Sequence, residues 1–145
     1  MKNYKGFYKE AKGNLPRIYC DMDGVLTDFV KAASKATGQN WEGMRHGQDW
    51  DSIKNTPNFW SNMPWMPGGK QLWGYIKKHN PHILSASVKN NADPNCKPGK
   101  LRWISSNLKL NNSARINLVN RVQKQDYTMI GNSGKREQAV LIDDY

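Results

Sequence analysis

Four carboxylates occur as two close pairs, and each pair directly follows a short run of β-forming residues. The first pair is Asp21 and Asp23, and the second is Asp143 and Asp144. In open α/β sheets, active sites lie at the carboxyl ends of the strands. Clustered carboxylates without His or Cys form a hard oxygen site that favours Mg²⁺ over zinc. The two pairs therefore predict a magnesium site with these four aspartates as candidate ligands.

Two further polar side chains are expected near the same edge of the sheet. Ser85 ends a predicted strand, and Lys124 lies in the predicted loop after the strand at 116–119. A divalent cation, an ammonium group and a hydroxyl around one point suit a phosphoryl group. A turn or a helix cap would explain one aspartate pair alone, but it explains less readily two pairs accompanied by a hydroxyl and a lysine.

The elements that must position these residues alternate along the chain. Apolar runs predict strands, and apolar residues at helical spacing predict helices. The predicted strands are 17–20, 82–85, 116–119 and 139–142, and the helices are 29–36, one around Leu72, Tyr75 and Ile76, and one around Leu101, Ile104 and Leu108. Residues 39–66 are expected to be irregular and residues 88–99 to form a polar loop. Alternating strands and helices favour the α/β class, with a mostly parallel sheet flanked by helices.

Composition sets broad bounds on the protein class. At roughly 150 residues per domain, 145 residues predict a single domain, here 17–145 after a basic leader at 1–16. The net charge of +10 suits an anionic partner, whether a nucleic acid, a nucleotide or a membrane. No apolar run approaches the roughly 18 residues of a membrane helix, so a membrane protein is not expected. Two Cys make neither a disulfide framework nor a zinc set, which predicts a cytoplasmic protein.

Residues 18–29, IYCDMDGVLTDF, resemble the first motif of the haloacid dehalogenase (HAD) superfamily of phosphotransferases. Within that superfamily, DGVLTDF resembles the 5'(3')-deoxyribonucleotidase group, which includes phage and bacterial members. The segments FWSNMP at 59–64 and PGG at 67–69 resemble the return from that group's small cap. ILS at 83–85 resembles the second motif and VLIDD at 140–144 the fourth. The resemblance covers roughly residues 17 to 145.

The resemblance implies a HAD-like, Rossmannoid fold with a small cap inserted at about 30–66. It also implies an aspartyl-phosphate mechanism, with Asp21 as the nucleophile and Asp23 as the acid and base. Asp21, the backbone carbonyl of Asp23 and the terminal aspartate pair would hold Mg²⁺. Ser85 would hydrogen-bond a phosphoryl oxygen. For a phage protein, the compartment would be the host cytoplasm.

Which lysine neutralises the phosphoryl charge is left open by the sequence. Lys124 follows the third strand, as the third motif of the superfamily should. Lys135 is nearer the aspartate pair but lies in GNSGK, which is typical of a turn. Lys100, on the helix after the second strand, is a candidate for a supplementary phosphate contact. With 22 basic residues in the chain, solvation is the simplest explanation for any one of them.

The cap aromatics also allow two interpretations. Phe59, Trp60 and Trp65 could wall a pocket in which a nucleobase stacks. They could equally pack the cap onto the core, which is the commoner fate of large aromatic side chains.

The leading function predicted is a Mg²⁺-dependent phosphomonoester hydrolase acting on nucleoside monophosphates. The alternatives are a phosphatase of another small phosphoester, such as a sugar phosphate, and a catalytically weak protein that binds nucleic acid or a partner chain. The distribution of basic residues discriminates between them. A ring around the strand ends favours a small anionic substrate, whereas a surface remote from Asp21 favours nucleic acid.

The resemblance departs from the superfamily after the aspartate pair. Relatives continue with a helix and a further strand, so residues 139–142 are expected to form an exposed edge strand. Exposed edges invite pairing, which predicts a homo-oligomer or a covering partner. Weak Mg²⁺ binding and low activity are expected of the chain alone, because metal ligands on a frayed end lose their fixed geometry.

Overall fold

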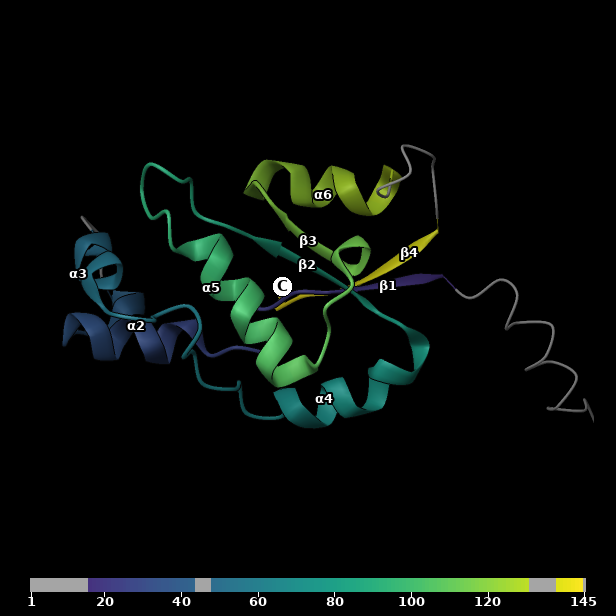
Figure 1. The fold of residues 1–145 in the computed structure, drawn as a ribbon, viewed down its shortest axis with the longest axis horizontal. Coiled ribbons are helices and arrows are strands. Elements are labelled where there is room, and N and C mark those ends of the chain that lie inside the picture. The colour runs from purple at the N-terminus through teal and green to yellow at the C-terminus, as the bar shows by residue number, and fades with distance from the viewer. Residues whose placement is uncertain (1–15, 44–47, 131–137, 145) are drawn as a thin grey trace, which may run out of the picture.

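A four-stranded, all-parallel sheet forms the centre of the protein (Figure 1). The computed structural model describes residues 16–43, 48–130 and 138–144. The strands lie in the order β3-β2-β1-β4, which makes β1 a central strand and β4 an outer one. Their bounds match the prediction closely: β1 (Arg17–Cys20), β2 (His82–Ala86), β3 (Ile116–Val119) and β4 (Ala139–Ile142). The predicted α/β class is confirmed. The leader at 1–15 and Lys135 lie outside the described residues.

Helices cover both faces of the sheet (Figure 1). One face carries α6 (Arg121–Ile130), and the other carries α4 (Gly69–Ile76) and α5 (Cys96–Trp103). Beyond the carboxyl ends of the strands lie α2 (Phe29–Thr37) and α3 (Trp50–Asn55). Short helical turns complete the chain: η1 (Trp41–Gly43), η2 (Lys77–His79), η3 (Ile104–Leu108, a π-helical continuation of α5) and η4 (Ser113–Arg115). None of the helices in the described part of the chain is both long and apolar enough to cross a bilayer.

Two segments expected to be irregular are helical instead. Residues 39–66 contain η1 and α3, and α3 begins because the Asp49 side chain accepts a hydrogen bond from the backbone N–H of Ser52. This is an N-cap, which satisfies a free donor of the first turn. The predicted loop after β3 is α6, so Lys124 lies on a helix. The polar loop predicted at 88–99 ends earlier, because α5 starts at Cys96.

The main core lies between the sheet and the α4–α5 layer. It includes Cys20, whose side chain is fully buried, with Ile83, Trp103 and Ile104. Two expected core residues are instead exposed: Tyr75 is 72% exposed and Leu101 is 44% exposed. In α4, the neighbouring Trp73 and Ile76 occupy the buried face and turn Tyr75 outward.

The cap leaves the sheet and returns to it at one neck. The backbone N–H of Asp28 donates to the carbonyl of Pro64, and that of Met66 donates to the carbonyl of Leu26. The two N···O distances are 2.9 and 2.8 Å respectively. Residues 29–63 therefore form an excursion that starts and ends beside the first aspartate pair, so the cap elements stand over the carboxyl end of β1.

Candidate active site

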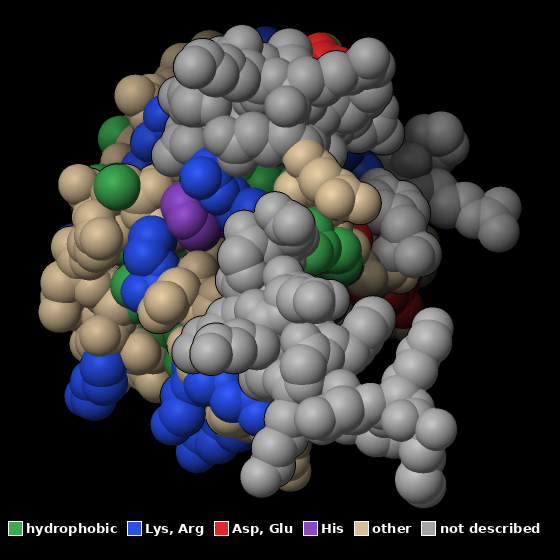
Figure 2. All heavy atoms as spheres, turned by 90° about the vertical axis from the view of Figure 1, so that its right-hand side faces the viewer, with side chains coloured by type: hydrophobic (Ala, Val, Ile, Leu, Met, Phe, Trp, Pro, Cys, Tyr) green, Lys and Arg blue, Asp and Glu red, His purple; other side chains and the backbone are tan. Residues whose placement is uncertain are grey.

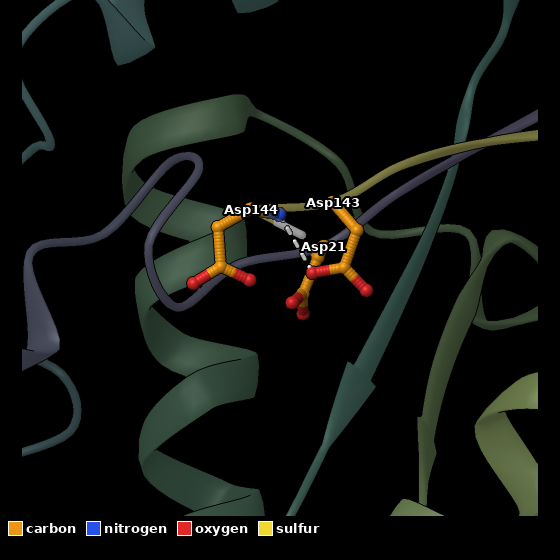
Figure 3. A group of neighbouring side chains, drawn as sticks. All are labelled: Asp21, Asp143 and Asp144. Atoms are coloured by element: carbon orange, nitrogen blue, oxygen red, sulfur yellow. Dashed lines mark hydrogen bonds between the residues drawn. The ribbon is translucent and has the colours of Figure 1, made fainter.

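The two predicted aspartate pairs meet at the carboxyl edge of the sheet. The parallel pairing of β1 and β4 continues past both strands, since the N–H of Asp21 donates to the carbonyl of Ile142 at 3.0 Å. Asp143 and Asp144 therefore emerge beside Asp21. One carboxylate oxygen from each of the three lies within 4.8 Å of the others (Figure 3). Figure 3 shows the three side chains on the same side of the chain, with Asp21 and Asp143 turned toward one another.

The loop after β1 is a tight turn that presents the Asp21 carboxylate. The carbonyl of Met22 accepts hydrogen bonds from the N–H groups of Val25, Leu26 and Thr27. Gly24 has φ of +82°, a conformation that glycine adopts without steric cost. A Cβ on Gly24 would stand 2.5 Å from Oδ2 of Asp144. Glycine is therefore required at position 24 for two reasons, namely the turn and the close approach of Asp144.

Lys124 joins the aspartate cluster from α6. Its Nζ lies 2.7 Å from Oδ2 of Asp21 and 2.8 Å from Oδ2 of Asp143. Of the two candidate lysines that the structure describes, Lys124 contacts Asp21 and Lys100 contacts Asp23. The bridge draws the two carboxylates together and offsets part of their mutual repulsion.

Burial and this network set the ionisation of the cluster. Desolvation raises the pKa of Asp21 to about 6, against the opposing effect of the Lys124 ammonium. Burial also raises the pKa of Asp143, but hydrogen bonds from Asp144 and Lys124 outweigh it and lower that pKa to about 2. The pKa of Asp144 is raised by its hydrogen bond with Asp143. Burial lowers the pKa of Lys124, but its two carboxylate partners raise it overall, so the side chain is an ammonium at neutral pH.

The Asp23 carboxylate is not a member of the three-carboxylate cluster, and the metal contact expected of its backbone carbonyl stays a prediction. Its Oδ2 pairs with Nζ of Lys100 at 2.8 Å, and its Oδ1 accepts from the Thr27 hydroxyl at 2.9 Å. The Asp23 side chain is 32% exposed, whereas Lys100 is 1% exposed. Asp23 thus has its own cationic partner and still faces solvent.

Lys100 and Ser85 form a second polar group next to the cluster. The Nζ of Lys100 also contacts the Ser85 hydroxyl at 3.0 Å and donates to the carbonyl of Ala86 at 2.8 Å. The ammonium lies 5.3 Å from the ring centroid of Trp60, within the range of a cation–π contact. A Cβ on Gly99 would stand 2.5 Å from Cβ of Trp60, so this glycine lets α5 approach closely enough for Lys100 to reach the site.

A cleft of about 760 Å³ opens over these groups. This volume is in the range of small-molecule sites, about 300–1,000 Å³. Three aromatic residues of the cap line it, namely Phe29, Trp50 and Trp60. Of the aromatic residues proposed from the sequence, Trp60 lines the cleft. Phe59 is buried in the cap core, and Trp65 packs against Trp103 at a centroid distance of 4.9 Å.

Sequence reasoning missed the roles of Phe29 and Trp50 in this wall. Phe29 is the last residue of the first motif, so its proximity to the strand end was a usable signal. The signal for Trp50 was weaker. Asp49 is the helix N-cap residue of α3, the helix that begins at Trp50. Arg121 also lines the cleft, from the first turn of α6.

The cap aromatics hold one another in place. The Phe29 and Trp60 rings are stacked, with centroids 5.7 Å apart and planes 20° apart. Trp60 is further held by a 2.7 Å hydrogen bond from its indole N–H to Oδ2 of the buried Asp93. The apolar wall of the cleft is therefore a fixed surface facing the polar groups at the strand ends.

The chemistry of the donor set fits a hard divalent cation. The three clustered side chains offer carboxylate oxygens only, and among the described residues neither His nor Cys lines the cleft. In comparisons with known proteins, no protein-family model matches the chain, and no curated protein matches it.

Proposed function

We propose that the protein is a Mg²⁺-dependent phosphomonoester hydrolase of the HAD superfamily, acting on nucleoside monophosphates. The observation that carries this proposal is the buried Asp21 carboxylate at the end of a central parallel strand, flanked by Asp143, Asp144 and the Lys124 ammonium. The first motif and the terminal aspartate pair, which resemble those of the 5'(3')-deoxyribonucleotidase group, support the same assignment.

Asp21, Asp143 and Asp144 are the residues that would hold the metal ion. Oxygen ligands of this kind are those that Mg²⁺ prefers. When bound, Mg²⁺ would reduce the repulsion between these carboxylates and a phosphate dianion. The Asp23 side chain, paired with Lys100, remains free of this role.

Asp21 would act as the nucleophile. Its carboxylate oxygen would form a bond to phosphorus while the bond from phosphorus to the ester oxygen breaks, which produces an aspartyl-phosphate and an alcohol. Lys124 and Lys100, which line the cleft, and the Ser85 hydroxyl, which contacts Nζ of Lys100, would donate hydrogen bonds to the oxygens of the transferred group. Such fixed donors stabilise the charge that develops in phosphoryl transfer.

Asp23 would move the protons. Two residues beyond Asp21 and 32% exposed, it can reach the ester oxygen that leaves and the water that enters. It would first give a proton to the leaving oxygen, then take one from the water that attacks phosphorus and releases the phosphate. These two steps return Asp21 and Asp23 to their starting states.

The cap wall supports a nucleotide as the substrate. Phe29, Trp50 and Trp60 face the phosphate-binding groups across the same cleft. A nucleoside monophosphate has a charged end for the strand edge and a flat base for an aromatic wall. A sugar phosphate has the first feature without the second.

A phosphate-release screen tests this proposal. Wild-type protein would be assayed with nucleoside monophosphates and sugar phosphates, with Mg²⁺ and with EDTA, and Asp21→Asn serves as the matched inactive variant. We expect Mg²⁺-dependent release, highest for nucleotides and lost in the variant. Release from sugar phosphates alone would contradict the substrate class. Absence of release from every substrate, or equal release by Asp21→Asn, would contradict the enzyme assignment.

A further inference from the structure

Basic residues are concentrated in the middle of the chain. Between residues 52 and 125 the sequence carries 12 Lys and Arg but a single acidic residue, Asp93. Asp93 is buried, so it does little to offset positive charge at the surface. Lys100, Arg121 and Lys124 account for the part of this charge that lines the active-site cleft. The remainder lies elsewhere and has no role in the proposed hydrolysis.

Strand pairing brings several of the remaining basic residues to the opposite end of the sheet. Tyr19 pairs with His82 and Ile83 pairs with Ile116, so the first residues of β1, β2 and β3 lie at the same end of the sheet. Both Nε and Nη2 of Arg115 donate to the carbonyl of Pro81, which ties η4 to the segment between η2 and β2. The residues at this end, here called the basic edge, are Arg17, Lys77, Lys78, His79 and Arg115.

Figure 2 views this end of the molecule directly. Among the described residues on this face, Lys and Arg side chains are visible in several places with a His among them, and Asp and Glu are visible toward the margin. Lys77 and Lys78 are exposed, and the active-site aspartates lie at the other end of the strands. The basic edge is therefore a charged surface separate from the catalytic cleft.

An exposed aromatic ring adjoins this charge. Tyr75, two residues before η2, is 72% exposed, and Nζ of Lys78 lies 5.5 Å from its ring centroid. On the same helix, Nζ of Lys70 lies 5.8 Å from the ring centroid of Trp65. Aromatic rings on which bases stack, interleaved with cations that follow the backbone, are the usual elements of single-strand nucleic-acid binding.

We propose that the basic edge, together with Tyr75, binds single-stranded nucleic acid. The charges come from three separate chain segments along the sheet edge, a spacing that suits a polyanion better than an isolated phosphate group. A membrane surface is disfavoured because the exposed face of α4 offers Lys70, Gln71, Gly74 and Tyr75 without the exposed aliphatic residues that insert into lipid. This binding is independent of the proposed phosphatase activity.

The test measures the anisotropy of a labelled oligodeoxythymidylate of roughly 20 nucleotides, titrated with full-length protein at salt concentrations from about 50 to about 200 mM. Divalent ions are omitted. The test variant is Lys77→Gln/Lys78→Gln. The matched control is Lys31→Gln/Lys35→Gln, which removes the same charge from two exposed positions of α2 at the other end of the sheet. Tyr75→Ser tests stacking.

We expect the test variant to bind roughly tenfold more weakly at low salt. The slope of log K against log salt concentration should be less steep by about 1.4, since each lost phosphate contact to a single strand removes about 0.7. The control should stay within about twofold of wild type, and Tyr75→Ser should weaken binding about fivefold or more. Equal losses of affinity in the test and control variants would show that binding depends only on net charge, and would overturn the proposal. Binding to anionic vesicles without oligonucleotide binding would also overturn it, in favour of a membrane surface.

Discussion

Replacing Asp21 by Asn should abolish turnover and, in the absence of Mg²⁺, stabilise the fold. The pKa of Asp21 is about 6, against 3.8 for an unperturbed aspartate, because burial disfavours the ionised carboxylate more than Lys124 favours it. At about 1.4 kcal/mol per pH unit, keeping this group ionised at pH 7 costs the fold about 3 kcal/mol. Asparagine has nearly the same shape and no charge, so it avoids this cost.

The pH dependence follows from the same raised pKa. Below pH 3.8 the carboxyl is protonated in both states, and stability falls as the pH rises from 3.8 to about 6. The advantage of Asp21→Asn should therefore be complete at pH 7 and only about 1 kcal/mol at pH 4.5. Mg²⁺ should stabilise the wild type and not the variant, because a ligand stabilises only the state that binds it.

Urea unfolding at both pH values, with EDTA and with Mg²⁺, measures these differences. Asp126→Asn is the control, since it removes an exposed carboxylate of α6. A variant less stable than wild type at pH 7 in EDTA would refute the reasoning. An advantage of the same size at pH 4.5 would likewise show that its source is not the ionisation of Asp21.

Three further predictions concern the site. Asp23→Asn should slow nucleotide hydrolysis by about 10²–10⁴-fold and slow an aryl phosphate less, because a good leaving group needs little protonation; equal losses would argue against Asp23 as the acid. Trp50→Leu should raise KM for nucleoside monophosphates roughly tenfold while leaving sugar phosphates unchanged, since it removes part of the aromatic wall; equal rises in steady-state assays would place the base elsewhere. The apparent Mg²⁺ affinity, measured by calorimetry, should fall about tenfold per pH unit below about 6, because the metal must displace a proton from Asp21; constant affinity from pH 5 to 7 would contradict this.

Apolar runs predicted the strands, and the expected parallel pairing of those strands predicted the meeting of Asp21 with Asp143 and Asp144. Adjacent parallel strands end at the same edge, so residues that follow them are neighbours. Lys124 was placed near the cluster for the same reason, although its segment was expected to be a loop. The salt bridge between Lys124 and Asp21 supports this placement.

Features that depend on how side chains pack outside the sheet were not predictable in this way. The pairing of Asp23 with Lys100 joins residues 77 positions apart and depends on how closely Gly99 lets α5 approach Trp60. The exposure of Tyr75 was missed because α4 has eight residues, and Trp73 and Ile76 compete for its buried face. Trp50 reaches the cleft only through the folding of the whole cap.

Trapping the phosphorylated protein tests the central claim most directly. Asp23→Asn should accumulate the aspartyl-phosphate from an aryl phosphate, because bond cleavage needs little acid help while the attacking water lacks its base. After an acid quench, we expect one hydroxylamine-labile phosphoryl group per chain, mapped to the peptide that contains Asp21, and none in EDTA. Phosphate release by the wild type with no trapped phosphoryl group in this variant, or with the group on another residue, would contradict the account.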